Sequence, residues 1–205
     1  MSKIRSIIFD FGDVFINLDK EGAMSNALEL FQLEHFDDDM LATNIAYEMG
    51  QISTETFIDF YLTKFNTLDK AQIIEAWNYI LKDFPIYRLN FLKQLKEHYD
   101  YKLLLLSNTN ELHINAVKSK VPFYEEFKSC FDAFYLSHEI KKRKPNSDIF
   151  EFVLDENQLM PEESLFIDDT EENTTSARQL GLNIWNIDEK KEDVIQLFDL
   201  KKELF

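Results

Sequence analysis

The feature that most constrains the fold is a series of short apolar segments that each end abruptly in polar residues. The first segment, Ile4–Phe9, runs into Asp-Phe-Gly-Asp. A second, Lys102–Ser107, is almost entirely leucine, and a third, Ser164–Asp168, closes in two consecutive acidic residues. Short continuous apolar runs are typical of strands that are buried on both faces. The pattern therefore predicts strands inside a covered sheet.

Helical sequence alternates with strand sequence through the second half of the chain. Two further strands are expected at 133–136 and 183–187, and helices are expected at 88–98, 110–119, 148–155, 174–180 and 192–200. Gly181 is the expected C-terminal stop of the helix before it. Alternation of this kind indicates a parallel sheet with helices on both faces. We predict an α/β fold with a doubly wound parallel sheet.

One long block interrupts the alternation. Residues 17–85 have the character of amphipathic helices and contain no convincing strand. Asp69, followed three residues later by Gln72, has the spacing of a helix-capping box. We predict that residues 1–16 and 86–205 form one α/β core domain and that residues 17–85 form a helical cap domain inserted after the first strand.

Composition narrows the possible partners and the cellular location. The 205 residues include 22 basic and 38 acidic side chains, a net charge of −16. Nucleic acids and anionic membranes would be repelled, so we expect neither as a partner. The single cysteine, Cys130, excludes an internal disulfide framework. No segment has the apolar length of a signal peptide or a spanning helix. We expect a soluble cytoplasmic protein, with a monomer as the default state.

Four polar motifs follow the predicted strands or strand regions. They are Asp10-Phe11-Gly12-Asp13, Ser107-Asn108-Thr109-Asn110, Lys141-Lys142-Arg143-Lys144-Pro145 and Asp168-Asp169-Thr170. The carboxyl ends of the strands in a doubly wound sheet lie along one edge, so these motifs should converge there. Clustered carboxylates repel one another unless a cation lies among them, and oxygen ligands suit Mg²⁺. With Lys144, such a site would bind phosphate, and the Asp10 carboxylate could attack the phosphorus atom.

The four motifs, in this order, resemble the haloacid-dehalogenase-like hydrolase superfamily from Ile7 to Asn186. The runs 8–14, 106–110 and 143–145 resemble its branch of small sugar-phosphate phosphatases, which includes α-D-glucose-1-phosphate phosphatase. The resemblance implies a magnesium-dependent phosphatase that hydrolyses a small phosphorylated metabolite, most simply a sugar phosphate, through an aspartyl-phosphate. The helical insertion would act as a lid over the site.

The resemblance also implies a role for individual residues. Asp10 matches the nucleophile and a metal ligand, and Gly12 matches a position whose backbone carbonyl ligates the metal. Ser107, Asn108 and Lys144 match the residues that bind the phosphoryl group. The acidic pair Asp168 and Asp169 matches the remaining metal ligands, with Asp169 as the expected direct ligand.

One position departs from the pattern of the superfamily. Most of its phosphatases carry an aspartate two residues after the nucleophile as general acid and base, whereas this chain has Gly12 there and Asp13 next. Loss of such assistance typically costs ~10²–10⁴-fold in rate. We hypothesise that a substrate with a good leaving group, such as a sugar 1-phosphate, loses least. Asp13 is a poor substitute, because a displacement of one residue in a tight turn re-aims its side chain.

Three other functions are compatible with parts of the sequence. A 2-haloacid dehalogenase also lacks the second acid of the first motif, but it needs no metal and has no use for Asp168 and Asp169. A catalytically silent binding or regulatory protein would explain Gly12, although it would not explain why the chain retains Asp10, Ser107, Lys144, Asp168 and Asp169. A phosphorylatable receiver domain lacks a large helical insertion.

The four histidines have no metal-ligand spacing among them. Two of them, His113 and His138, lie near predicted strand ends.

Overall fold

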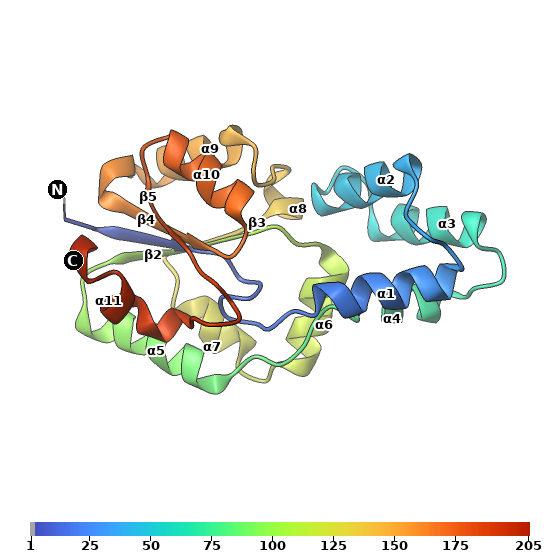
Figure 1. Ribbon diagram of the computed structural model, residues 1–205, viewed down its shortest axis with the longest axis horizontal. Helices are drawn as coiled ribbons and strands as arrows, with labels where there is room; N and C mark the ends of the chain where they lie inside the picture. The colour runs from blue at the N-terminus through green and yellow to red at the C-terminus, as the bar shows by residue number, and fades with distance from the viewer. Residues whose placement is uncertain (1–2) are drawn as a thin grey trace.

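The computed structural model describes residues 3–205 and contains a five-stranded sheet in the order β3-β2-β1-β4-β5 (Figure 1). The strands are β1 (Ser6–Phe9), β2 (Lys102–Ser107), β3 (Ala133–Leu136), β4 (Ser164–Asp168) and β5 (Asn183–Asn186). Every neighbouring pair is parallel. The predicted doubly wound parallel sheet is confirmed.

The register of β1 brings the polar motifs to one edge of the sheet. Phe9, the last residue of β1, lies opposite Leu105 of β2 on one side and Ile167 of β4 on the other. The carboxyl ends of these three neighbouring strands are therefore adjacent. Asp10 follows β1 directly, while Ser107 and Asp168 are the last residues of β2 and β4.

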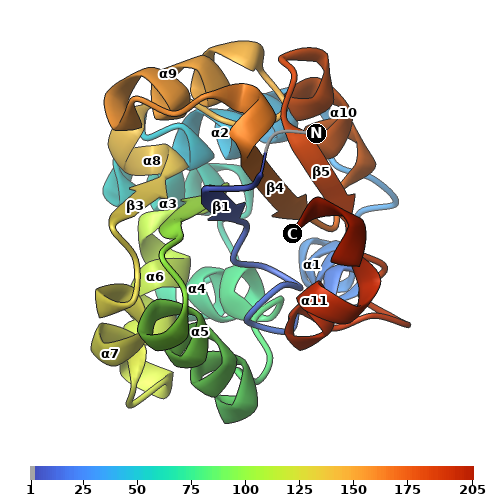
Figure 2. The same ribbon diagram turned by 90° about the vertical axis from the view of Figure 1, so that its left-hand side faces the viewer.

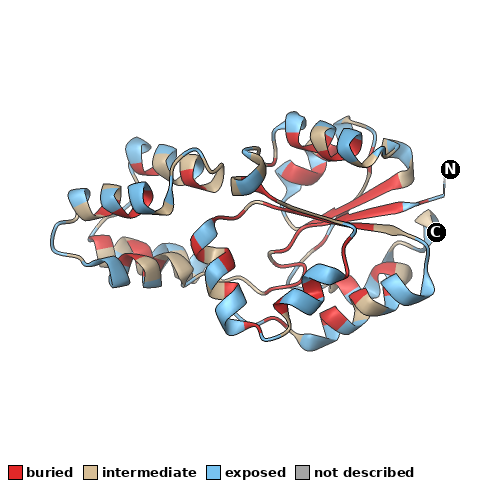
Figure 3. Cartoon of the chain, turned by 180° about the vertical axis from the view of Figure 1, so that it is seen from behind, coloured by how far each residue is buried: buried red, intermediate tan, exposed pale blue. Residues whose placement is uncertain are grey.

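Helices cover both faces of the sheet, as Figures 1 and 2 show. On one face are α5 (Ile86–His98), α6 (Glu111–Lys120), α7 (Tyr124–Ser129) and the short α11 (Leu197–Leu200); on the other are α9 (Ser147–Asn157) and α10 (Glu171–Gln179). Strand side chains alternate between the two apolar layers: Ile7 and Phe9 pack into the first and Ile8 into the second. Buried residues accordingly run through the strands in Figure 3.

Four helices lie between β1 and α5 in the chain and project beyond the carboxyl ends of the strands (Figure 1). They are α1 (Lys20–Phe31), α2 (Asp38–Glu48), α3 (Thr54–Lys64) and α4 (Lys70–Asn78). They share a hydrophobic cluster, joined by Leu112 of α6, in which the Tyr61 ring packs against the rings of Phe31 and Phe57. We call these helices the cap; the domain boundaries at 16/17 and 85/86 stay predictions.

Two linkers connect the cap to the rest of the chain and run side by side. The backbone N–H of Asn17 donates to the Asp83 carbonyl at 2.9 Å, and the N–H of Lys82 donates back to the Asn17 carbonyl at 3.0 Å. Asp19 N–H donates to the Ile80 carbonyl at 2.9 Å. This short antiparallel pairing defines the path by which α1 enters the cap and α4 leaves it.

Two local sequence signals, a capping box and a glycine after a helix, correctly predicted helix ends. The capping box at Asp69 and Gln72 is present at the start of α4, and Gly181, with φ of 91°, follows α10. The expected helix at 192–200 begins later, as a 3₁₀ turn at Val194–Gln196, because Asp193 caps that turn. The short helices α7 and α8 (Ser137–Ile140) were not predicted, since each offers too few residues for a period to show.

Among residues 3–205, no helix has both the length and the apolarity that crossing a membrane requires. The cytoplasmic location and the monomeric state stay predictions.

Candidate active site

A buried lysine holds together carboxylates from two strands. The Nζ atom of Lys144 lies 2.8 Å from Asp10 Oδ1 and 2.6 Å from Asp168 Oδ2. The side chains of Lys144 and Asp168 are 1% and 0% exposed, so the pairs are shielded from solvent. A buried charge is costly unless it is paired and hydrogen-bonded, and here each charge has an opposite partner.

Lys144 is held in position by a residue of another predicted motif. Its backbone N–H donates to Asn108 Oδ1 at 2.9 Å, and Asn108 Nδ2 donates to the Lys144 carbonyl at 2.9 Å. This reciprocal pair fixes the loop that carries Lys144 against the end of β2. The structure places Asn108 beside Lys144, and a substrate-binding role for Asn108 stays a prediction.

Three carboxylates converge at the end of β1 and β4. One oxygen from each of Asp10, Asp168 and Asp169 lies within 4.8 Å of the others. Asp168 is oriented from several sides: Asn173 Nδ2 donates to both of its oxygens at 3.0 and 3.1 Å, and the Thr170 N–H donates at 2.8 Å. Asn173 was not predicted from the sequence. Its place five residues after Asp168, on the first turns of α10, explains how it reaches the carboxylate.

The electrostatics of this cluster show an excess of negative charge. Burial, reinforced by Asp168, raises the pKa of Asp10 to about 7 despite the opposing effect of Lys144. Burial also raises the pKa of Asp169, although Lys20 opposes it. Burial alone would lower the pKa of Lys144, but Asp10 and Asp168 outweigh it and raise that pKa. The site therefore favours additional positive charge.

Asp13, the residue that follows Gly12, stabilises the turn after β1. Asp13 adopts a left-handed conformation with φ of 54°, which aspartate tolerates better than most residues. Its Oδ1 accepts from the Leu18 N–H at 2.8 Å, and its Oδ2 lies 2.9 Å from Lys20 Nζ. Asp13 is therefore committed to the turn, consistent with the expectation that it cannot replace the missing acid at Gly12.

Lys20 is a site residue that sequence reasoning missed. It is the first residue of α1 in the cap, and its ammonium contacts the Asp169 carboxylate as well as Asp13. A lysine at the start of a helix has no distinctive sequence signal. Its position became visible only when the fold brought the linker after β1 next to the end of β4.

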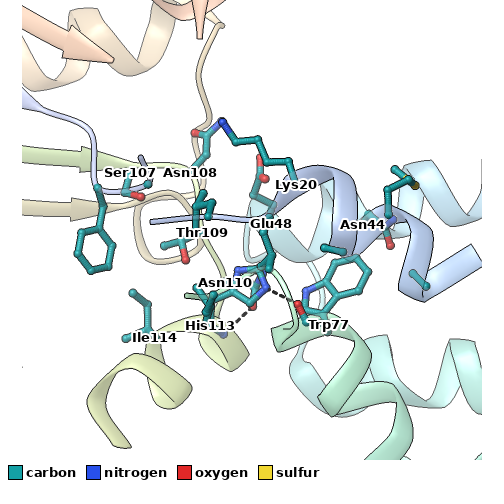
Figure 4. A pocket seen from close by; sticks show the side chains of 18 of the residues that line it. Lys20, Asn44, Glu48, Trp77, Ser107, Asn108, Thr109, Asn110, His113 and Ile114 are labelled. Carbon is teal, nitrogen blue, oxygen red and sulfur yellow. Dashed lines mark hydrogen bonds between the residues drawn. The ribbon is translucent and has the colours of Figure 1, made fainter. Parts of the chain in front are cut away.

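Two cavities meet at this edge of the sheet. The smaller, of about 250 Å³, is lined by Asp10, Lys144 and Asp169 among others. The larger, of about 440 Å³, lies between the cap and α6, and Figure 4 shows it from close by. Its walls are mainly apolar, with Ser107 at the end of β2 on one side. The cavities share four lining residues: Gly12, Leu18, Lys20 and Asn108.

His113 and Trp77 form part of the wall of the larger cavity. His113 Nε2 lies 3.0 Å from the Trp77 carbonyl, and Asn110 Nδ2 lies 3.2 Å from His113 Nδ1 (Figure 4). Since a carbonyl only accepts, Nε2 carries the proton and Nδ1 accepts from Asn110. Burial lowers the pKa of His113 to about 4. This histidine is a neutral structural link between α6 and the cap.

The cap also contacts the core at the far side of the cavity. Arg143 Nε lies 2.6 Å from Glu48 Oε1, and the Ser137 hydroxyl donates to the Glu48 carbonyl at 2.7 Å. Gly50, with φ of 60°, packs so closely that an added Cβ would lie 1.9 Å from the His138 carbonyl oxygen. Arg143, a member of the third polar motif, therefore pairs with the cap.

The comparisons with known proteins identify the class. A family model described as haloacid dehalogenase-like hydrolase matches residues 7–187, and the chain belongs to this family of enzymes. A solved HAD family enzyme of Bacteroides thetaiotaomicron, in complex with magnesium, is 34% identical with a TM-score of 0.85, over 96% of this chain and 99% of that one. It was also solved with magnesium and inorganic phosphate, at 33% identity and a TM-score of 0.82, covering 95% and 99% of the two chains.

A curated relative has a more specific description. D-ribitol-5-phosphate phosphatase of Bacteroides thetaiotaomicron is 28% identical over 189 residues, which cover 87% of this chain and 89% of the relative. A solved L-2-haloacid dehalogenase, 17% identical with a TM-score of 0.61 over 99% of each chain, shares the fold alone.

Proposed function

We propose that this protein is a magnesium-dependent phosphatase that hydrolyses a small sugar or polyol phosphate through a phosphoryl intermediate on Asp10. The observation that carries this proposal is the Lys144 ammonium buried between Asp10 and Asp168, with Asp169 completing a triad of carboxylates. The magnesium and phosphate complexes of the solved relative, and the ribitol-phosphate activity in the name of the curated one, support it.

The residues present fit a magnesium ion. Three carboxylates provide only oxygen ligands, which suit Mg²⁺. Burial and the neighbouring carboxylates both raise the pKa of Asp10, and a cation bound there would favour its charged form. Asp10, Asp169 and the Gly12 carbonyl would hold the ion, with Asp168 completing the site. When bound, Mg²⁺ would neutralise the charge shared by the carboxylates and the phosphoryl oxygens.

The chain's own residues account for two successive steps. An Asp10 oxygen attacks phosphorus and forms the aspartyl-phosphate while the ester bond to the leaving group breaks. Lys144 orients the phosphoryl oxygens in the smaller cavity, and the Ser107 hydroxyl, at the end of β2, would reach them from the side of the larger cavity. Water then attacks the same phosphorus, which releases inorganic phosphate and restores the Asp10 carboxylate.

The larger cavity supplies a compartment for the leaving group. Apolar walls with a few polar groups suit the carbon chain and hydroxyls of a small polyol or sugar.

A panel of phosphorylated metabolites assayed for phosphate release tests the proposal. It should contain ribitol 5-phosphate, sugar 5- and 6-phosphates and a sugar 1-phosphate, each with Mg²⁺ and with EDTA. We expect Mg²⁺-dependent release from at least one member. Dehalogenation of 2-haloacids that persists in EDTA would instead support the dehalogenase alternative. Preference for the 1-phosphate would support the leaving-group hypothesis drawn from Gly12.

A further inference from the structure

Lys20 lies at the boundary between the two cavities. Its Nζ is 2.9 Å from Asp13 Oδ2 and contacts Asp169, and these two carboxylate side chains are 8% and 7% exposed. The Lys20 side chain itself is 49% exposed. The ammonium is thus anchored on buried carboxylates while the side chain remains accessible from the cavities.

The shared wall of the cavities locates the bond that breaks. If the phosphoryl group lies in the smaller cavity, beside Asp10 and Lys144, its leaving group extends into the larger one. The ester oxygen then lies at the junction, which is formed by Gly12, Leu18, Lys20 and Asn108. Of these four residues, Lys20 alone carries a charge.

The other junction residues offer the ester oxygen little help. Gly12 has no side chain, and a Cβ there would lie 2.6 Å from Leu18 Cδ1, so leucine fills the adjoining space. Asn108 uses its amide oxygen and one of its two amide hydrogens in the paired contact with the Lys144 backbone, and it carries no charge. The nearby Asp13 carboxylate already accepts a hydrogen bond from the Leu18 N–H and pairs with the Lys20 ammonium.

Resting on the proposed phosphatase function, we infer that Lys20 is a catalytic residue that donates a hydrogen bond to the ester oxygen and stabilises the negative charge developing there. Lys20 keeps its proton throughout. As the bond from phosphorus to the ester oxygen breaks, that oxygen keeps the electron pair and takes a proton from water. The hydroxide left behind accepts the proton that a water molecule releases as it attacks the aspartyl-phosphate in the second step. A positioned donor at a developing oxyanion is worth roughly 10²–10³-fold in rate.

This role makes the effect of Lys20 depend on the leaving group. A p-nitrophenolate carries its negative charge readily and needs little stabilisation, whereas the alkoxide of a polyol needs much. We therefore expect K20M to lose about 10²–10³-fold in kcat/KM on the alkyl phosphate that the wild type prefers. On p-nitrophenyl phosphate, the loss should be below about 10-fold. K20R should recover part of the alkyl phosphate activity.

A matched control is available on the neighbouring linker. Lys82 also forms an ion pair near the linkers: its Nζ lies 3.3 Å from Asp19 Oδ2. Unlike Lys20, Lys82 lines neither cavity. K82M should leave both substrates unaffected. The melting temperatures of K20M and K82M, measured with and without Mg²⁺, report any loss of cap attachment.

The outcomes separate this inference from the proposed function. Equal losses on both phosphates, or no loss at all, would overturn the catalytic role of Lys20 while the phosphatase assignment stands. Failure of the wild type to hydrolyse any phosphate ester in Mg²⁺ would overturn both. A loss confined to the poor leaving group, with unchanged melting temperature, would support the role.

Discussion

The ammonium of Lys144 lies 2.8 Å from a carboxylate oxygen of Asp10, and both groups are buried at the edge where the sheet strands end. The two residues lie far apart in the sequence, Asp10 directly after β1 and Lys144 in the loop between α8 and α9. Their pairing places a cation beside the proposed nucleophile and leaves that carboxylate facing the smaller cavity.

Replacing this lysine should affect both catalysis and stability. K144A should lower kcat/KM by at least about 10²-fold, because phosphate binding loses its buried cation. Without metal, Asp10 and Asp168 would also face each other uncompensated. The pKa of Asp10, which burial already raises, would then rise further in the folded protein. The folded state would bind more protons than the unfolded chain and would lose stability as pH rises.

Urea unfolding of the metal-free proteins from pH 4 to 8 measures this effect. Because the pKa of Asp10 is about 7 in the wild type, the contribution of this carboxyl group to the free energy of unfolding should fall as pH rises. The free energy of unfolding of K144A should therefore fall with rising pH relative to that of the wild type. K142A is the matched control, since Lys142 pairs at 2.6 Å with the exposed Asp148. A pH profile of K144A that matches K142A would remove Lys144 from the buried cluster.

His113 should give the opposite pH dependence. Its pKa is lowered to about 4 by burial, below the ordinary value of 6.5, so the unfolded chain takes up a proton first as pH falls. The free energy of unfolding should therefore decrease from pH 6.5 toward 4, by at most about 1.4 kcal/mol per pH unit from this group. NMR titration of the imidazole, with H98Q to assign an exposed histidine, checks the value. A titration near pH 6.5 would contradict it.

Gly50 should be needed for cap docking. G50A would place a methyl group against the His138 carbonyl, so the loop after α2 must move away from α8. We expect a rise in KM of about 10-fold or more, since the cavity wall shifts. G181A is the control: it has the same backbone strain, of about 1–2 kcal/mol, but its nearest contact is Pro161 at 3.5 Å. It should lower the melting temperature and leave KM unchanged.

The sequence predicted the parts of the site that follow strands. Asp10, Ser107 and Asp168 sit at strand ends, and parallel topology alone brings strand ends together. Lys144 was expected as the cation of the phosphate site from its motif, and the resemblance implied the same role. Its contacts with Asp10 and Asp168 are present. The strands at 133–136 and 164–168 also have the predicted bounds, because apolar runs closed by polar residues mark both ends.

Contacts made by helix surfaces could not be predicted in the same way. Lys20 reaches Asp169 only because the two linkers hold α1 over the end of β4. The contact of His113 with Trp77 depends on how the cap lies against α6. Neither placement has a periodic signal in the chain, since both depend on the orientation of the cap relative to the core.

The central claim is a metal-dependent mechanism through Asp10. Its most direct test compares phosphate release by the wild type and by D10N in parallel assays, one with Mg²⁺ and one with EDTA. Circular dichroism verifies that D10N is folded, which is expected because Asn preserves the shape of the side chain. We predict that the wild type releases phosphate only with Mg²⁺ and that D10N releases none in either condition. Substantial turnover by folded D10N, or wild-type release that survives EDTA, would contradict a metal-dependent mechanism through Asp10.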